Sequence, residues 1–396
     1  MPDAQDMPFT PAEYARRIAL TRAEMARRGL DVLVVTDPSN QNWLTGYDGW
    51  SFYVHQAVVL PLEGQPFWWG RRQDANGAAR TVDPQATGIA FYEDHFVQST
   101  ARHPMQDLAA QLRERGLARG RMGVEMDNYY FSAKAYLALT EALRGMPILD
   151  ATALVNWQRA VKSAEEIAFM QRAAVITQKI VALALDEAAP GLRKNDLAAK
   201  ITAAGIEGAG GHWGDYPAIV PLMPSGADAA APHLTWNGDA MRAGEVTFFE
   251  LAGCYRRYHV PLARSVFFGT PPDPIRNGEF ALVQGLEAGL EVARAGNRAC
   301  DIANALGAVM EHAGIERAAR CGYGVGLSYP PDWGERTISL RPEDETVLKP
   351  GMTFHFMPGL WMDGWGLEIT ETILITDDGP PTCFCDMPRK LFVRDG

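Results

Sequence analysis

The stretch Val246-Thr247-Phe248-Phe249-Glu250-Leu251 marks the point at which this chain of 396 residues turns from mainly helical to mainly strand-like sequence. Its β-branched and aromatic residues favour a strand. Period-2 alternation places Phe248, Glu250 and Ala252 on one face of that strand. A carboxylate on an apolar face is costly unless it is paired. Glu250 is therefore a candidate site residue, and a structural salt bridge is its alternative role.

Outward from this stretch, paired helices and further strands fill the C-terminal part of the chain. Ser163 and Glu166 form the capping-box pattern that opens a helix, and Pro190-Gly191 ends that helix. Helices in pairs around antiparallel strands predict an α+β domain. We expect further helices at 195–206, 277–293 and 300–313, and further strands at 265–268, 353–356 and 368–376.

The N-terminal part alternates between strand and helix patterns. Thr10, Pro11 and Glu13 are typical of a helix start, and apolar residues continue at helical spacing towards Gly29. This alternation predicts an α/β domain that ends near residue 155. Strands are expected at 31–35 and 56–60, and helices at 105–115 and 132–143.

Composition argues against several functions. The chain has 37 Lys and Arg against 48 Asp and Glu, and the net charge of −11 disfavours nucleic-acid binding and a polybasic membrane surface. No apolar run reaches the roughly 18 residues that span a bilayer, and we expect no secretory signal in the acidic first residues. Five cysteines are an odd and low number, typical of reduced thiols in a cytoplasmic protein.

Three further features are typical of a site. His233 lies in a loop rich in Gly, Ala and Pro, although a lone loop histidine is more often structural. The glycine-rich run at 321–327 lacks a phosphate-loop lysine and a clear preceding strand, which argues against dinucleotide binding. Near the C-terminus, alternation places Glu368 and Glu371 on opposite faces of a predicted strand.

These features, in this order, resemble the pita-bread family, which includes creatinase, aminopeptidase P, prolidase and methionine aminopeptidase. The helix opening at 161–167 and the turn at 348–352 add to the resemblance, which covers the whole chain. It implies an α/β creatinase-type N-terminal domain over residues 1–160. It also implies an α+β pita-bread catalytic domain over residues 161–396.

The sequence differs from those of the family's metallopeptidases at the positions of the metal ligands. Those enzymes hold two metal ions with two Asp, one His and two Glu. At most two carboxylates survive here, whereas a catalytic metal site needs about three protein ligands. The resemblance therefore implies a site with no metal and no other cofactor. The matching positions are Glu250, Pro261, Tyr323, Met357 and either Thr370 or, after a shift of one residue, Glu371.

Two longer strings, at 39–56 and 322–337, are similar to those of a branch of this family that hydrolyses ectoine. Ectoine is a cyclic amidine carboxylate, and opening its ring gives N-acetyl-2,4-diaminobutyrate. The resemblance implies a metal-independent hydrolase that acts on a C–N bond of ectoine, with hydroxyectoine as a further candidate substrate. Two alternatives remain, namely a creatinase-like amidinohydrolase acting on another small zwitterion, and a non-catalytic pita-bread protein that only binds.

An amidinium cation presents two N–H donors in a fork, for which a carboxylate is the natural bidentate partner. Glu250 is the expected catalytic anchor, and it either activates a water or attacks the amidine carbon directly. By the resemblance, His233 moves the proton that lets a ring nitrogen leave, and Arg336 binds the substrate carboxylate. The other expected substrate contacts are Tyr323, Tyr329, Glu368 and the two tryptophans Trp361 and Trp365.

Quaternary structure is implied by the same resemblance. Creatinase-type enzymes pair head to tail, so we expect a homodimer in which Phe52 and Tyr53 of one subunit close the pocket of the other. An association with the deacetylase that acts on the product is also implied. Nucleic acids and membranes are not expected as partners.

Overall fold

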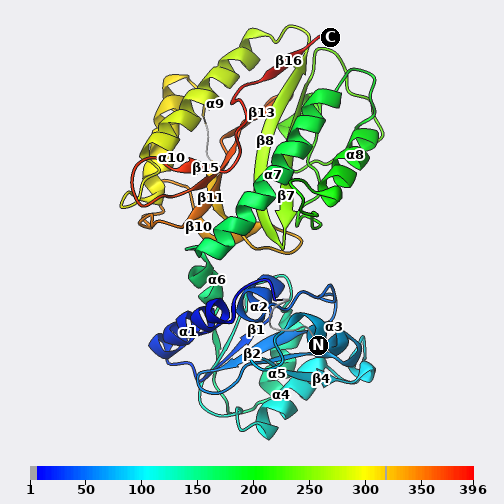
Figure 1. Cartoon of the computed structure of the whole chain (residues 1–396), viewed down its shortest axis with the longest axis vertical. Coiled ribbons are helices and arrows are strands. Elements are labelled where there is room, and N and C mark those ends of the chain that lie inside the picture. The colour runs from blue at the N-terminus through cyan, green and yellow to red at the C-terminus, as the bar shows by residue number, and fades with distance from the viewer. Residues whose placement is uncertain (1–6, 317–318) are drawn as a thin grey trace. The chain divides into compact units, whose positions relative to one another are not determined.

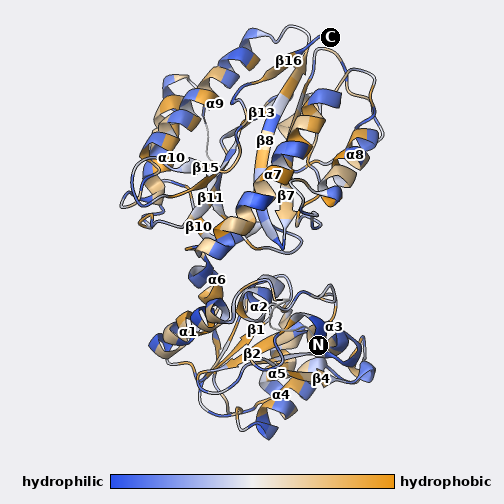
Figure 2. Cartoon of the chain, in the orientation of Figure 1, coloured by the Kyte–Doolittle hydropathy of each residue, from blue (hydrophilic) through white to orange (hydrophobic). Residues whose placement is uncertain are grey.

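The computed structural model describes residues 7–316 and 319–396, and it divides into two compact units (Figure 1). Unit 1 comprises Met1–Arg159 and unit 2 comprises Ala160–Gly396. Each unit has its own hydrophobic core. Figure 2 shows hydrophobic residues along the central strands of unit 1, whereas the helices carry hydrophilic residues on their outer faces.

Unit 1 is built on a six-stranded mixed sheet with strand order β4-β3-β2-β1-β5-β6. Strand β1 is buried on both faces, since Val32 and Val34 pack on one side and Leu33 and Val35 on the other. The strands are β1 (Val32–Val35), β2 (Ala57–Pro61), β3 (Phe67–Arg71), β4 (Gly88–Tyr92), β5 (Met122–Val124) and β6 (Ile148–Asp150).

Helices cover both faces of this sheet. Residues of α4 and α5 pack on one face, and residues of α1, α2, α3 and α6 pack on the other. The unit is thus an α/β sandwich of three layers, as its sequence pattern predicts. The helices are α1 (Pro11–Arg28), α2 (Pro38–Thr45), α3 (Arg72–Thr81), α4 (Pro104–Glu114), α5 (Ala133–Ala142) and α6 (Leu154–Arg159).

Unit 2 combines three groups of strands with four long helices. The long hairpin of β7 and β8 is joined by β16, and a five-stranded sheet has the order β10-β9-β11-β14-β15. The helices are α7 (Ala164–Glu187), α8 (Lys194–Glu207), α9 (Asp273–Val292) and α10 (Ala299–His312). The strands are β7 (Val246–Tyr255), β8 (Tyr258–Phe268), β9 (Gly322–Val325), β10 (Gly334–Ser339), β11 (Thr353–Phe356), β12 (Gly359–Met362), β13 (Trp365–Glu368), β14 (Glu371–Leu374), β15 (Thr382–Cys383) and β16 (Phe392–Arg394).

The five-stranded sheet has an apolar face and a polar face. Phe354, Phe356 and Ile373 pack with residues of α9 and α10 in one core cluster. Alternation along β11 therefore turns His355 to the opposite face. Tyr323 is the direct cross-strand neighbour of His355, so both side chains belong to that polar face.

Helix α7 begins and packs as its sequence predicts. Ser163 accepts from the backbone N–H of Glu166, and the Glu166 carboxylate accepts from the backbone N–H of Ser163, which completes the predicted capping box. By length and composition alone, α7 is also apolar enough to cross a membrane. It packs against β7 and β8, as a core helix of a soluble domain does.

One strand prediction in unit 2 needs correction. The predicted strand at 368–376 is interrupted, because β13 ends at Glu368 and β14 begins at Glu371. Thr370 between them bonds to β8 instead, through its backbone N–H to the carbonyl of Ala263 and through its hydroxyl from the N–H of Ala263. Most of the glycine-rich run at 321–327, for which the sequence predicted no element, forms β9.

Candidate active site

The centre of the candidate site is Glu250, which β7 presents inside unit 2. Its cross-strand neighbour on β8 is Ala263, and only 4% of the residue is exposed. Burial raises the pKa of the Glu250 carboxyl to about 8. A carboxyl with that pKa is mostly protonated at neutral pH, which relieves the cost of an unpaired buried charge. The alternative role of a structural salt bridge is not observed, since no Arg or Lys pairs with Glu250 in the described part of the chain.

A second buried carboxyl group lies near the first. Glu368 ends β13, is fully buried, and neither of its carboxyl oxygens accepts a hydrogen bond within the described residues. Burial, and then the charge of Glu250, raise the pKa of Glu368 well above its usual range. We name Glu250 and Glu368 the carboxyl pair. Two buried acids without a protein cation form a site that suits a cationic ligand.

A chain of hydrogen bonds borders the carboxyl pair. His355 Nδ1 lies 3.9 Å from Glu250 Oε1 and 3.2 Å from the Tyr323 hydroxyl. Trp333 Nε1 donates to the same hydroxyl at 2.8 Å, and His355 Nε2 lies 2.8 Å from Thr370 Oγ1. Burial, followed by the charge of Arg320, lowers the pKa of His355 to about 3, so its imidazole is neutral. We call Thr370, His355, Tyr323 and Trp333 the hydrogen-bond chain.

The hairpin of β12 and β13 separates the two predicted wall tryptophans. A Cβ atom at Gly359 would meet both the Trp361 ring and Cγ of Glu368, so Trp361 lies on the same face as Glu368. Trp365 points to the other face, where it packs on the core and against Gly278 of α9. The prediction that Trp365 forms a wall of the pocket is therefore wrong. Side chains alternate along β13, so Trp365 and Glu368 point to opposite faces, and Trp365 packs on the core.

Three other predicted residues lie outside this cluster. His233 is exposed, in a turn that follows the 3₁₀ helix η3 (Gly226–Ala230), and no hydrogen bond or ion pair links it to the described residues around Glu250. Arg336 is also exposed, whereas its neighbour Glu335 points inward to a buried ion pair with Lys162. Tyr329 is buried beside Arg257 at the turn of the β7–β8 hairpin.

These positions change the assignment of the substrate-binding residues. Arg257 lies seven residues beyond Glu250 across the hairpin turn, and β7 extends about 17 Å from Glu250 to that turn. Tyr329 therefore has a packing role at the far end of the hairpin. Arg320, whose guanidinium lies 4.5 Å from the centre of the Tyr323 ring, is the exposed cation that contacts the hydrogen-bond chain. It is a better-placed candidate than Arg336 for a substrate carboxylate.

The comparisons with known proteins agree with this architecture. The Creatinase/Prolidase N-terminal domain matches residues 17–161, and Metallopeptidase family M24 matches residues 168–377. The ectoine hydrolase of Halomonas elongata is 56% identical over 98% of this chain and 99% of its own length. The chain belongs to the creatinase and M24 metallopeptidase family. The predicted pita-bread membership is thereby confirmed.

Solved structures of this family share the whole fold. The dipeptidase PepE from Mycobacterium ulcerans superposes with a TM-score of 0.80 at 25% identity, over 97% of this chain and 99% of that one. A prolidase from Thermococcus sibiricus gives a TM-score of 0.82 at 19% identity, over 96% and 99% of the two chains. The predicted fold class, a creatinase-type α/β domain followed by a pita-bread α+β domain, is confirmed.

The M24 family model implies metal ions, which the residues of this chain do not fit. Within residues 7–316 and 319–396, no group of three or more His, Cys, Asp or Glu side chains is arranged to hold a metal ion. Pro261 and Met357 offer no carboxylate at two of the family's ligand positions, and Thr370 is engaged with Ala263 and His355. This donor set is poor in ligands that hold a catalytic divalent cation.

Glu371, the alternative ligand after a shift of one residue, is excluded by its surroundings. Its carboxylate accepts from Arg264 at 2.7 Å and from Arg389 at 3.2 Å. Arg264 is completely buried and also donates to the carbonyl of Thr370. Glu371 therefore stabilises the junction of β8 and β14.

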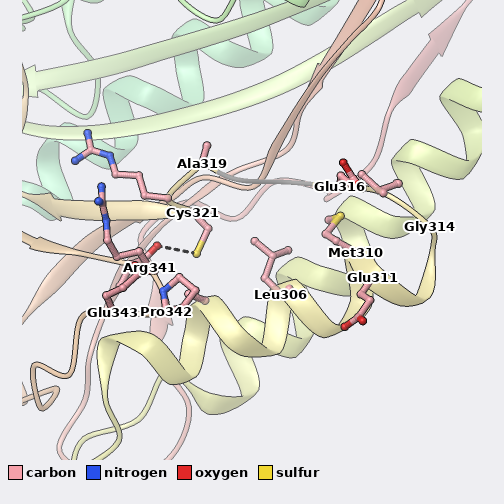
Figure 3. A pocket seen from close by; sticks show the side chains of 15 residues that line it. Leu306, Met310, Glu311, Gly314, Glu316, Ala319, Cys321, Arg341, Pro342 and Glu343 are labelled. Atoms are coloured by element: carbon pink, nitrogen blue, oxygen red, sulfur yellow. Dashed lines mark hydrogen bonds between the residues drawn. The ribbon is translucent and has the colours of Figure 1, made fainter.

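The pocket drawn in Figure 3 adjoins the candidate site at Arg320, which is one of its lining residues. It lies between α10 and the residues next to β9, with Leu306, Met310 and Arg341 among the side chains that line it. The Cys321 thiol in this pocket donates to the carbonyl of Leu340 at 3.3 Å. No member of the carboxyl pair or the hydrogen-bond chain is among the described residues that line the pocket.

Phe52 and Tyr53, the residues expected to reach a partner's site, belong to an aromatic cluster of unit 1. The ring of Phe52 lies 4.5 Å from that of Trp50 and 5.4 Å from that of Tyr130. Tyr53 is 65% exposed and its hydroxyl accepts from Arg71 at 2.8 Å. This cluster leaves large aromatic rings on the surface of the unit.

Proposed function

We propose that this protein hydrolyses the ring of ectoine to N-acetyl-2,4-diaminobutyrate, without a metal ion. The observation that carries the proposal is the carboxyl pair, Glu250 and Glu368, buried together with no Lys or Arg of the described residues paired to either group. A protonated cyclic amidine supplies the planar cation that such a pair lacks. The whole-length similarity to the ectoine hydrolase of Halomonas elongata supports ectoine as the substrate.

The burial of the carboxyl pair supports a direct role of Glu250 and Glu368 in the chemistry. Once the amidinium binds, Glu250 loses its proton and becomes a carboxylate next to the carbon between the two ring nitrogens. It then either activates a water or attacks that carbon itself. The second carboxyl, Glu368, is placed to hold an N–H of the amidinium and to return a proton to the leaving nitrogen. The ring C–N bond breaks, and water supplies the oxygen of the new amide.

Binding of the substrate should release a proton at pH 7. Burial raises the pKa of Glu250 to about 8, so this group is mostly protonated at pH 7 in the ligand-free protein. An amidinium at contact distance lowers that pKa and drives the proton off. Calorimetric titration of ectoine in buffers of different ionisation enthalpy measures the number of protons released. A binding enthalpy that does not depend on the buffer would contradict the assignment.

The direct test of the proposed function is incubation of the purified protein with ectoine, with products followed by NMR. Appearance of N-acetyl-2,4-diaminobutyrate is the expected result. A different amidine as the preferred substrate would instead favour a creatinase-like amidinohydrolase. Binding with no turnover of any small amidine would favour a non-catalytic binding protein.

Removal of metal ions should leave the activity intact. Pro261 and Met357 stand at family ligand positions, and the described residues offer no three-ligand cluster. We expect full turnover of ectoine after exhaustive EDTA treatment, together with substoichiometric metal by elemental analysis. Stoichiometric zinc, manganese or cobalt, with activity that is lost to the chelator and restored by the metal, would overturn this prediction.

The protein should be a homodimer in solution. The aromatic cluster of unit 1 exposes 59% of Trp50, 65% of Tyr53 and 60% of Tyr129, a surface that a second copy would cover. Sedimentation velocity should give a species of twice the 43.4 kDa chain mass. A monomer that retains full activity would refute both the dimer and the proposed contribution of Phe52 and Tyr53 to a partner's site.

Three further expectations stay predictions. His233 is proposed as a carrier of the proton that reaches the leaving nitrogen, since its turn follows η3, which packs against β13. The five cysteines of the chain are free, and a cytoplasmic location remains the expectation from their number. Association with a deacetylase that acts on the product is likewise a prediction.

A further inference from the structure

The hydrogen-bond chain contains the Tyr323 hydroxyl. The direction in which its proton points decides whether this hydroxyl can donate a hydrogen bond to a ligand in the site. Tyr323 accepts a hydrogen bond from Trp333, because an indole N–H can only donate. The same phenol oxygen lies 3.2 Å from His355 Nδ1. Glu250 Oε1 lies 3.9 Å from that nitrogen, which is too far for a hydrogen bond. His355 Nδ1 therefore bonds to Tyr323, and the direction of this bond depends on the imidazole tautomer.

Thr370, at the other end of the hydrogen-bond chain, selects the tautomer of His355. Its hydroxyl oxygen accepts from the backbone N–H of Ala263 at 2.7 Å and lies 2.8 Å from His355 Nε2. If His355 Nε2 carried the proton, the Thr370 hydroxyl would receive two hydrogen bonds and its own proton would have no acceptor. Thr370 is fully buried, so that orphan donor would be costly. With Nε2 as the acceptor, the Thr370 hydroxyl donates to it and is satisfied.

This assignment of hydrogens fixes the Tyr323 proton as well. His355 then carries its proton on Nδ1 and donates to the Tyr323 oxygen, which already accepts from Trp333. Both lone pairs of the phenol are thus used, and its O–H has to donate elsewhere. Glu250 and Tyr323 both lie within 4 Å of His355 Nδ1, so the Tyr323 hydroxyl borders the candidate site. We expect its proton to be donated to a group in that site.

We propose that His355 is a positioning residue whose tautomer, set by Thr370, turns the Tyr323 hydroxyl into a fixed hydrogen-bond donor for the reacting amidine. The proposal deepens the proposed function and rests on it for the identity of the ligand. When the amidine carbon is attacked, a ring nitrogen gains a localised lone pair. A donor held in place before the reaction stabilises that lone pair without reorganisation. The neutral state of His355 agrees with this role.

The tautomer itself can be measured without any substrate. Nitrogen-15 NMR of the histidine side chains, with the His355 signals assigned by their loss in His355→Asn, should show a neutral ring protonated at Nδ1. Thr370→Val, which keeps the side-chain shape and removes the hydroxyl, should move the proton to Nε2. A wild-type ring protonated at Nε2 would overturn the proposal, whether or not ectoine is the substrate.

Turnover of ectoine then tests the consequence of the tautomer. Tyr323→Phe should lower kcat by about 10²-fold, in the range for removal of one preorganised donor, with little change in KM. Thr370→Val should lower kcat by about 10-fold in the wild-type background but by less than about 2-fold in the Tyr323→Phe background, because it acts through the phenol. His355→Asn, which retains a side-chain N–H, should keep more activity than His355→Leu.

The outcomes separate the failure of each proposal. Equal losses from Thr370→Val in the two backgrounds, in variants whose melting temperatures match the wild type, would show that Thr370 does not act through Tyr323 and would overturn the inference. Absence of ectoine turnover in the wild-type protein would reject the proposed function alone, because the NMR arm still reports the tautomer.

Discussion

Replacing Glu250 with Gln should lower kcat for ectoine by at least about 10³-fold, in the range seen when a catalytic group is removed. The substitution keeps the shape of the side chain. It removes the carboxylate that anchors the amidinium and that serves as base or nucleophile. Steady-state kinetics with product detection by NMR measures the loss, and circular dichroism confirms that the variant is folded.

The matched control for this variant is Glu125→Gln in unit 1. Glu125 is also a buried carboxyl, and burial likewise raises its pKa to about 8, but it accepts hydrogen bonds from the backbone of Thr36 and Asp37. We expect Glu125→Gln to affect stability and to leave kcat within about 3-fold of the wild-type value. Near-normal turnover by a folded Glu250→Gln variant would show that Glu250 is not the centre of the chemistry.

The largest effect on stability is expected from Arg264→Met. Arg264 is completely buried, forms the ion pair with Glu371, and donates to the carbonyls of Thr370 and Met387. Its loss leaves a buried carboxylate with only the partly exposed Arg389 as its cation. Removing one partner of a buried ion pair costs about 3–5 kcal/mol. Urea denaturation of the full chain should show this loss in the unfolding transition of unit 2.

The control for Arg264→Met is the same substitution at the surface of the same unit. Arg394 pairs with Asp186 across 3.2 Å, and both side chains are largely exposed. Exposed ion pairs contribute about 0–1 kcal/mol, so Arg394→Met should be nearly neutral. If Arg264→Met destabilised the protein no more than Arg394→Met, the junction of β8 and β14 would not depend on the buried pair.

Features set by neighbouring residues could be predicted from the sequence. Thr10 and Ser163 cap their helices as expected, and Gly29 ends α1 in the left-handed conformation with φ of 67°. Each signal depends on contacts within four residues. The break between β13 and β14 could not be predicted in this way, because Thr370 bonds to Ala263, 107 residues earlier in the chain.

The same difference between local and long-range contacts separates the site residues that could be predicted from those that could not. Glu250 was predicted because a carboxylate inside an apolar strand is a local anomaly. The role of His355 was missed, because Tyr323 and Thr370, its partners, lie on other elements of unit 2. One signal was available: His355 alternates with Phe354 and Phe356 in β11, as a residue on a polar face does. Trp365 was misassigned because the direction of the β12–β13 hairpin depends on packing against α9.

The pairing of β16 with β8 has a consequence for how the chain folds during synthesis. β16 (Phe392–Arg394) runs parallel to β8 and lies at the edge of the sheet that also contains β7 (Figure 1). Domains generally fold from the N-terminus as the ribosome releases them. Unit 1 has all of its strands once β6 has been synthesised, whereas the sheet that carries Glu250 receives β16 only after β8 and all the elements between them have been synthesised. Nascent unit 2 therefore exposes the edge of β8 until β16 has been synthesised, and this is the stage at which chaperones would protect it.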